Sequence, residues 1–189
     1  MKFILGLGNP GSKYKKNRHN VGFLALDYLV EKRREFIDRV INKNELQIVE
    51  FKKKNYIFVK PLTYMNLSGK IISFLRKKYF LKDSRDLFVI YDDLDLNFGR
   101  LKIKFGGSSG GHKGVESIIS FLGKDFTRIR IGIGRPKDRD VVRYVLSDFS
   151  KNEIDFLYTE VFPVVDDIVE DINSGDSIEK IMTKYNRRN

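Results

Sequence analysis

Two histidines, His19 and His112, are the residues of this 189-residue chain best suited to acid–base chemistry at neutral pH. The chain has no cysteine, which excludes thiolate nucleophiles, disulfides and cysteine-ligated zinc. We also expect no serine nucleophile elbow of the G-x-S-x-G type. A histidine that works with a carboxylate but without a side-chain nucleophile points to water as the nucleophile, with the carboxylate fixing the imidazole tautomer. Side-chain amides can then position the water and polarise a carbonyl group.

His19 lies in a loop that follows a short apolar strand over residues 2–8 and precedes a predicted helix over residues 20–35. The partial positive charge at a helix N-terminus is expected to keep the imidazole neutral, as a general base requires. A histidine at this place can also be only a cap or hydrogen-bonding residue, without any chemistry.

The same loop contains Gly6, Gly8 and Gly11 in the G-x-G-x-x-G spacing of dinucleotide-binding proteins. That fingerprint requires a helix that starts at the third glycine and an acidic residue at the end of a second strand. Here Pro10 precedes the third glycine, a charged run follows it, and Asp27 falls inside the predicted helix. We therefore disfavour a dinucleotide-binding enzyme.

Apolar runs and their periodicity predict an α/β fold in which strands and helices follow one another without an internal repeat or linker. The expected strands after the first cover residues 46–51 and 56–59, as a hairpin, and then 87–91, 100–105 and 127–134. The expected helices after the first cover residues 71–75, 115–122, 141–146, 151–173 and 177–185.

Three carboxylates, Asp92, Asp93 and Asp95, follow the apolar strand over residues 87–91. The carboxyl ends of strands are where the sites of α/β proteins form. The spacing fits no calcium loop, and any one of the three can simply form a turn.

Two further loops carry residues of interest. Asn66 can cap the helix that follows it, while Tyr64 and Met65 can be either core or an exposed platform. The glycine-rich segment 106–114 precedes a helix whose first N–H groups are suited to binding an anion.

Charge is distributed unevenly along the chain, whose formal net charge is +11. Residues 1–150 contain 31 basic and 16 acidic residues, whereas residues 151–189 contain 5 and 9. A basic body favours a polyanionic partner such as nucleic acid, although lysine-rich solvated faces give the same composition. The length predicts one domain over residues 1–189, and the lack of a signal-like or 18-residue apolar segment predicts a soluble, cytoplasmic protein.

Six segments lie in order along nearly the whole chain: Gly6–Gly11 (GLGNPG), Arg18–Asn20 (RHN), Met65–Gly69 (MNLSG), Asp92–Leu96 (DDLDL), Gly110–His112 (GGH) and Arg130–Gly134 (RIGIG). Together they resemble the bacterial peptidyl-tRNA hydrolase family. Each segment is short, but six in the same order are highly specific. The resemblance implies a monomeric, single-domain α/β protein without metal or other cofactor, in which helices flank a mixed, mostly parallel twisted sheet in three layers.

The resemblance also implies an activity and a partner. Members of the family hydrolyse the ester that joins a peptide, or an N-blocked aminoacyl group, to the 3′ end of tRNA, and so recycle tRNA from stalled translation. By correspondence with the family, we expect His19 to be the catalytic base and Asp92 to orient it. Asn9 is expected to help distinguish blocked from free aminoacyl groups, and Asn66 to contribute to catalysis and to substrate binding.

Other positions correspond to the family's contacts with peptidyl-tRNA. The expected walls of the cleft for the peptide and the 3′ end are Tyr14, Tyr64, Met65 and Asn66. Lys102, Lys104 and Arg130 are expected to contact tRNA phosphates, because cleavage that ignores tRNA identity needs backbone contacts rather than base readout. His112 and Lys113 complete the expected contacts. The family usually has asparagine at position 113, and lysine can donate but not accept a hydrogen bond.

A non-catalytic RNA-binding relative of the same fold is the alternative, because the family also resembles a plastid splicing factor. The presence of Asn9, His19, Asn66 and Asp92 together favours the hydrolase.

Overall fold

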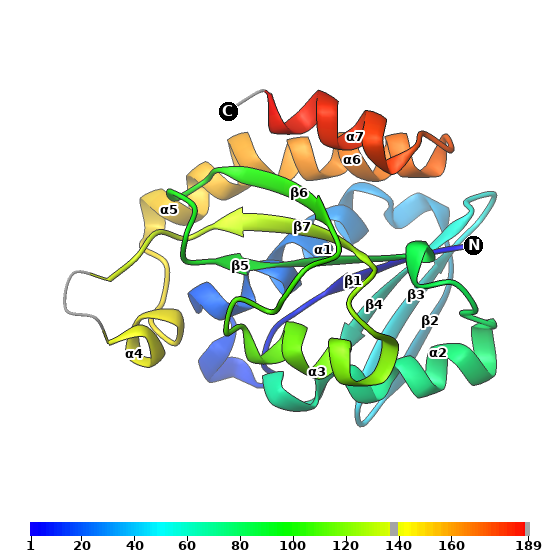
Figure 1. The fold of residues 1–189 in the computed structure, drawn as a ribbon, viewed down its shortest axis with the longest axis horizontal. Helices are drawn as coiled ribbons and strands as arrows, with labels where there is room; N and C mark the ends of the chain where they lie inside the picture. Colours follow the sequence, from blue (N-terminus) through cyan, green and yellow to red (C-terminus); the bar gives the residue numbers. More distant parts are fainter. Residues whose placement is uncertain (137–139, 188–189) are drawn as a thin grey trace.

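The structure, a computed structural model, describes residues 1–136 and 140–187 and contains a seven-stranded sheet at its centre (Figure 1). The strands are β1 (Lys2–Gly6), β2 (Ile37–Lys43), β3 (Leu46–Phe51), β4 (Tyr56–Pro61), β5 (Leu87–Asp93), β6 (Leu101–Phe105) and β7 (Thr127–Gly132). Their order across the sheet is β2-β3-β4-β1-β5-β7-β6.

The sheet is mixed, as the family resemblance implies. The four strands at its centre, β4, β1, β5 and β7, run parallel to one another. The pairs β2–β3, β3–β4 and β6–β7 at the two sides are antiparallel. β1 is apolar after Lys2, and β5 is apolar up to Asp92, because strands in the middle of a parallel sheet are covered on both faces. Asp92 is the first polar residue of β5, at its carboxyl end.

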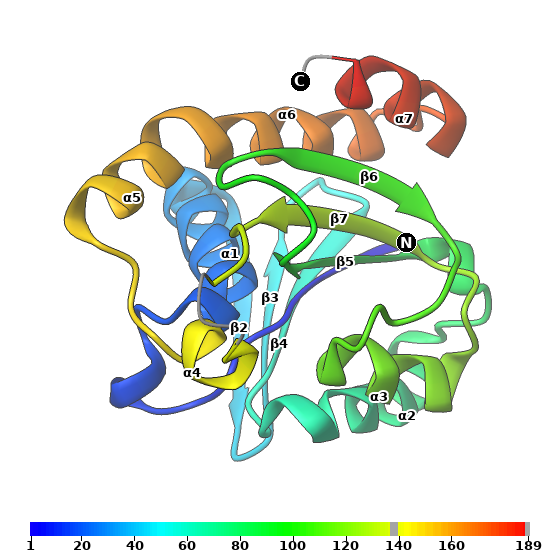
Figure 2. The same cartoon turned by 60° about the vertical axis from the view of Figure 1, so that its left-hand side comes forward.

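Helices cover both faces of the sheet, which gives three layers (Figure 2). The helices are α1 (Val21–Lys32), α2 (Ile71–Tyr79), α3 (Lys113–Leu122), α4 (Val141–Val145), α5 (Lys151–Phe156), α6 (Phe162–Asn173) and α7 (Ile178–Asn186). α1 and α6 pack on one face and α2 and α3 on the other. Alternate residues of β5 serve the two cores: Phe88 and Ile90 face α1 and α6, whereas Val89 and Tyr91 face α2 and α3.

α1 lies unusually close to β1, and this contact fixes the helix whose start carries His19. A Cβ atom added at Gly6 would lie 2.4 Å from the backbone oxygen of Gly22, and one added at Gly22 would lie 2.3 Å from the oxygen of Ile90. Since only glycine permits this approach, Gly6 and Gly22 set the depth of α1 on the sheet.

The observed elements differ from the expected ones in two places. β2 was not expected, and it is an edge strand whose side chains are mostly exposed. The helix expected over residues 151–173 is interrupted by the π-helix η6 (Leu157–Val161), which separates α5 from α6. In the described residues, no helix has the length and apolar character needed to cross a membrane.

Candidate active site

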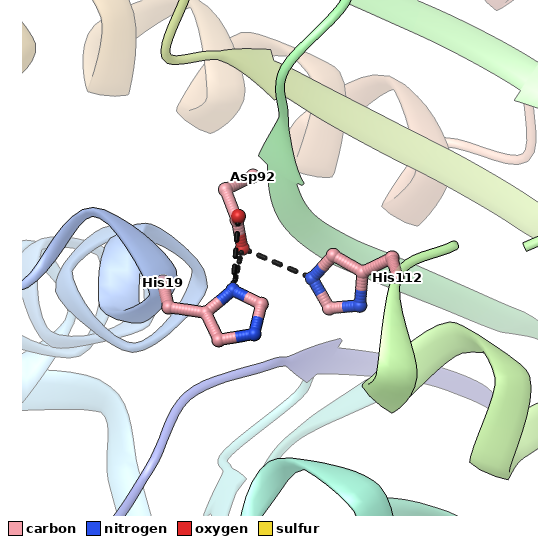
Figure 3. A group of neighbouring side chains, drawn as sticks. All are labelled: His19, Asp92 and His112. Atoms are coloured by element: carbon pink, nitrogen blue, oxygen red, sulfur yellow. Dashed lines mark hydrogen bonds and ion pairs between the residues drawn. The ribbon is translucent and has the colours of Figure 1, made fainter. Parts of the chain in front are cut away.

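Asp92, at the carboxyl end of β5, lies between the two histidines of the chain (Figure 3). Its side chain is buried, with 2% of its surface exposed. Nδ1 of His19 lies 2.9 Å from both carboxylate oxygens, and Nε2 of His112 lies 3.0 Å from Oδ1. Residues that are 73 and 20 positions away in the sequence are thus brought to one carboxylate.

His19 belongs to the 3-10 helix η2 (Arg18–Asn20), which leads directly into α1, so its predicted place at a helix N-terminus is confirmed. An ionised carboxylate only accepts hydrogen bonds, so Nδ1 of His19 must carry the hydrogen. Nε2 of a neutral ring then has a free lone pair, and within the described residues no group donates to it. The ring is 13% exposed, enough for a water or substrate to reach Nε2.

His112 contacts the same carboxylate with its other nitrogen. Its Nδ1 accepts hydrogen bonds from the backbone N–H groups of Gly114 and Val115, at 3.2 and 3.3 Å, and so caps α3. Nε2 must therefore carry the hydrogen that is donated to Asp92. These N–H groups were expected to be free for an anion, and that expectation is wrong because the ring of His112 already occupies them.

The two hydrogen bonds that Nδ1 of His112 accepts also limit metal binding at this site. One side-chain ligand atom from each of His19, Asp92 and His112 lies within 4.8 Å of the other two, which is compatible with a metal site. A metal at Nε2 of His112 would need the lone pair there, while Nδ1 needs its own lone pair for Gly114 and Val115. Only an imidazolate satisfies both, so the hydrogen bonds favour a proton-transfer site over a metal centre.

The three side chains shift one another's protonation. Burial disfavours the charged carboxylate, but the charges and hydrogen bonds of the two imidazoles outweigh burial and hold the pKa of Asp92 well below its usual range. Burial also works against charge on His19, but the attraction and hydrogen bond of Asp92 outweigh it and raise the pKa above its ordinary value of 6.5. The net direction is opposite to the one expected from the helix N-terminus alone, because the carboxylate is in direct contact with the ring.

Asn9, which is buried in the loop after β1, is held by its neighbours in one orientation. Its Oδ1 accepts a hydrogen bond from the backbone N–H of Met65 at 2.8 Å. The side chain of Asn20 pairs with the backbone N–H and C=O of Asn9, both at 2.9 Å. Among the described residues Nδ2 of Asn9 has no partner, so the amide offers its N–H groups to the cleft. Asn20 belongs to the RHN segment, but no local sequence pattern indicates that it positions Asn9.

A cavity of about 840 Å³ adjoins His19, Asp92, His112 and Asn9. Of the residues expected to contact substrate, it is lined by Asn9, His19, Tyr64, Met65, Asn66, Asp92, Lys104, His112, Lys113 and Arg130. Tyr14 and Lys102 do not line it. A second cavity of about 670 Å³, between the β2–β3 turn and α2, contains neither histidine nor Asp92.

The segment after β4 resolves the alternatives left open by the sequence. Tyr64 is 58% exposed and forms a platform at the cavity, whereas Met65 is buried and belongs to the core below α2 and α3. Asn66 is not a helix cap: it lies inside the 3-10 helix η4 (Met65–Lys70), exposed, and its side chain makes no hydrogen bond with the described residues.

Three basic residues of β6 and β7 line one side of the cavity: Lys104, Arg128 and Arg130. Lys102 lies opposite Arg130 in the antiparallel pair, and Lys104 lies opposite Arg128. Lys102 and Lys104 are exposed, whereas Arg130 is partly buried and pairs with Asp93. Lys113 is exposed at the start of α3 and pairs with Glu116 at 3.0 Å, a contact of the kind that contributes little stability.

Sequence reasoning missed two parts of the cavity. Arg128 is buried and donates to the backbone oxygens of Gly107 and Ser108, which anchors the glycine-rich loop that leads to His112. The other missed part is an apolar wall made by α4 and the residue after it, and its members are Val141, Val142, Val145 and Leu146. A short helix was expected there, but its periodicity could not show which side would face a cavity.

The expectation about serine needs a correction as well. Ser108 and Ser109 do have the G-x-S-x-G spacing within the run Gly106–Gly111. They lie in the loop after the edge strand β6 rather than in a strand-to-helix elbow. In the described part of the chain, neither hydroxyl is hydrogen-bonded to His19 or His112, and Ser109 Oγ accepts from the N–H of Gly111. The chain therefore has the spacing but not the geometry of a serine triad.

Comparison with known proteins identifies the family. The sequence model of a family described as peptidyl-tRNA hydrolase matches residues 3–189. A peptidyl-tRNA hydrolase of Fusobacterium nucleatum is 43% identical over 100% of this chain and 97% of its own length, and one of Thermodesulfovibrio yellowstonii is 46% identical over 99% and 100%. The crystal structure of peptidyl-tRNA hydrolase from Acinetobacter baumannii matches with a TM-score of 0.86 and 32% identity, over 98% of this chain and 94% of that one. The chain therefore belongs to the peptidyl-tRNA hydrolase family.

Proposed function

We propose that this chain hydrolyses the ester between a peptide, or an N-blocked aminoacyl group, and the 3′ end of tRNA, with His19 as the general base that activates water. The observation that carries this proposal is the pairing of His19 with Asp92, which leaves Nε2 as a free base in a cavity. Family membership over nearly the whole chain supports the choice of substrate.

The reaction begins with a water molecule between Nε2 of His19 and the carbonyl carbon of the ester. As the water oxygen bonds to this carbon, its proton passes to Nε2, and Asp92 stabilises the imidazolium that forms. The tetrahedral intermediate then expels the 3′ oxygen of the tRNA ribose, which takes the proton from His19. The products are a peptide with a free carboxyl group and a tRNA with a free hydroxyl. General-base catalysis of this kind contributes roughly 10²- to 10⁴-fold.

Asn9 and Asn66 supply amide groups near the reacting ester. Because Met65 holds Oδ1 of Asn9, its Nδ2 can donate to a carbonyl oxygen of the substrate. A blocked aminoacyl group presents an amide carbonyl, which accepts such a hydrogen bond. A free aminoacyl group presents an ammonium, which has only donors and a positive charge, so it faces Asn9 unfavourably. This difference accounts for a preference for blocked substrates.

The remaining cavity residues fit the two ends of the substrate. Tyr64 and Met65, with Tyr14 beyond the cavity, border the peptide and the 3′ end. Lys102, Lys104 and Arg130 contact tRNA phosphates without reading bases. His112 supports Asp92, and Lys113 at the cavity mouth can donate to a phosphate or carboxylate group.

We further propose that residues 1–189 act as one domain and as a monomer, because all the assigned residues come from one sheet and its flanking segments. Since the substrate arises in translation, we place the activity in the cytoplasm, without a cofactor.

The first experiment measures release of N-acetylaminoacyl groups from N-acetylaminoacyl-tRNA in single-turnover reactions. The wild type should cleave this substrate and spare unblocked aminoacyl-tRNA. His19→Ala should lose about 10²- to 10⁴-fold in rate while tRNA binding remains near normal. Arg85→Gln is the matched control, since Arg85 is exposed, pairs with Asp83 and lies at the opposite end of β5 from Asp92. A wild type that binds tRNA without cleaving it would make the chain an RNA-binding relative.

A further inference from the structure

Arg18, the residue before His19, has an ion-pair network that the catalytic scheme does not use. Its side chain is only 11% exposed, and NH2 donates to both carboxylate oxygens of Glu153, at 2.9 and 3.0 Å. NH1 donates to Ser147 Oγ at 3.0 Å and to the backbone oxygen of Asp148. These partners lie 129 to 135 positions away in the sequence, so Arg18 joins η2 to the loop after α4 and to α5.

Further contacts extend this junction along both segments. The Arg18 guanidinium lies 4.7 Å from the ring centroid of Tyr144 and 5.2 Å from that of Phe149. The backbone N–H of Arg18 donates to Ser147, and that of Phe149 donates to Lys16, at 3.0 and 2.9 Å. Backbone and side-chain contacts therefore fix the two segments in one register.

The segment held by Arg18 includes one wall of the cavity. Val141, Val142, Val145 and Leu146, which we call the α4 wall, line the cavity, and Val142 is 69% exposed. α4 packs against η2, the turn that carries His19. In Figure 2 α4 and α3 lie apart, and residues of both helices line the cavity. The distance between the α4 wall and His19 thus depends on the junction at Arg18.

We propose that Arg18 is a positioning residue that fixes the α4 wall relative to His19, and so sets how tightly the apolar side chain of the esterified residue is bound. This inference rests on the proposed hydrolase function. Removing the guanidinium would leave the backbone oxygen of Asp148 with water as its partner and Glu153 with only the backbone N–H of Ser150, so the side-chain link from η2 to these residues is lost. The wall would then lose its fixed place while the pair His19–Asp92 stays intact.

The kinetic test compares N-acetylleucyl-tRNA with N-acetylglycyl-tRNA for wild type and Arg18→Gln. The preference for the leucyl substrate should fall roughly tenfold, mainly through a higher KM, because contacts to one apolar side chain are worth about 10- to 200-fold in discrimination. Glycyl turnover should change little, since glycine has no side chain to touch the wall. Equal losses for both substrates would overturn the proposal.

Val142→Ala is the second variant, because it shortens the wall without touching Arg18. It should lower the same preference, and the double variant Arg18→Gln/Val142→Ala should lose less than the two single losses combined. If the double variant instead loses preference for the leucyl substrate by the product of the two single losses, Arg18 does not act through the α4 wall. If Arg18→Gln fails to fold, Ser147→Ala takes its place in this comparison of single and double variants, because it removes one acceptor of Arg18.

Amide hydrogen exchange tests the junction without any substrate. The amide of Phe149, bonded to Lys16, should exchange faster in Arg18→Gln than in wild type and in Arg85→Gln. Unchanged exchange would overturn the proposal even in an active enzyme. Faster exchange in a protein that cleaves no ester would instead confirm the junction and reject the hydrolase function, so the two failures are distinguishable.

Discussion

His19 and His112 approach one carboxylate from two sides of the cavity, and they differ in the use of their second nitrogen. His19 donates to Asp92 from Nδ1 and keeps Nε2 free. His112 donates from Nε2, and its Nδ1 is occupied by the N–H groups of Gly114 and Val115. Both residues are histidines, so it is their hydrogen-bond partners that distinguish His19, the general base, from His112, the supporting donor.

The segments that carry the two histidines also differ in how tightly they are packed. η2 is continuous with α1, which Gly6 and Gly22 hold tightly against the sheet. His112 follows Gly110 and Gly111, both with positive φ and without neighbours within 4 Å of an added Cβ. The free base thus lies on the more tightly packed element, whereas the supporting donor lies at the end of a loop and is fixed mainly by its cap to α3.

Asp92→Asn should have the largest effect on turnover, because it removes the carboxylate that orients the imidazole rings of both His19 and His112. A carboxamide at this position can donate to Nδ1 of His19, which would move the hydrogen to Nε2 and abolish the free base. The expected loss in turnover is up to about 10⁴-fold, as for a wrong imidazole tautomer in a catalytic triad. Single-turnover hydrolysis with tRNA affinity as the control measures it. Unchanged turnover would shift the role to Asp93.

His112→Asn should have a much smaller effect. Asparagine can still cap α3, but it no longer donates to Asp92 as His112 does. We expect turnover to fall by about tenfold, the value of one supporting hydrogen bond, against about 10²- to 10⁴-fold for His19→Ala. The ratio of the two losses is the measurement. Equal losses would mean that the two histidines are not distinguished by their free nitrogen.

The pH dependence of turnover should identify which ring is the base. Burial lowers the pKa of His19, but Asp92 raises it above 6.5, and a general base must be neutral. The rate should therefore be lost as the pH falls through this raised value. In Asp92→Asn only burial remains, so the acid limb of the residual activity should move to lower pH. Single-turnover rates between pH 5 and 9 test this, and a limb that does not move would exclude His19.

Several features of this site could be predicted from the sequence because they depend on local patterns. Asp92 follows an apolar run that only a buried strand explains, and His19 precedes residues with clear helical spacing. β2 escaped prediction because its burial pattern has no regular alternation: as an edge strand, it is mostly exposed on both faces.

Other features depend on contacts that no local pattern shows. The sequence indicates that His112 is next to a helix, but not that its ring turns Nδ1 toward Gly114 and Nε2 toward Asp92. The network of Arg18 joins segments more than 120 positions apart, and the α4 wall becomes a wall only through that network. The tertiary fold determines these side-chain orientations and contacts.

The smallest expected effect concerns the stability of the loop that carries His112. His112→Ala removes both the donor to Asp92 and the acceptor for the N–H groups of Gly114 and Val115, whereas His112→Asn retains an acceptor at the cap. The free energy of unfolding should therefore be lower for the alanine variant than for the asparagine variant by about 1 kcal/mol. Urea unfolding of the two variants measures this difference, since changes at Asp92 are common to both. Equal stability would show that the cap contributes nothing, and would remove the reason to assign Nδ1 of His112 to the backbone rather than to proton transfer.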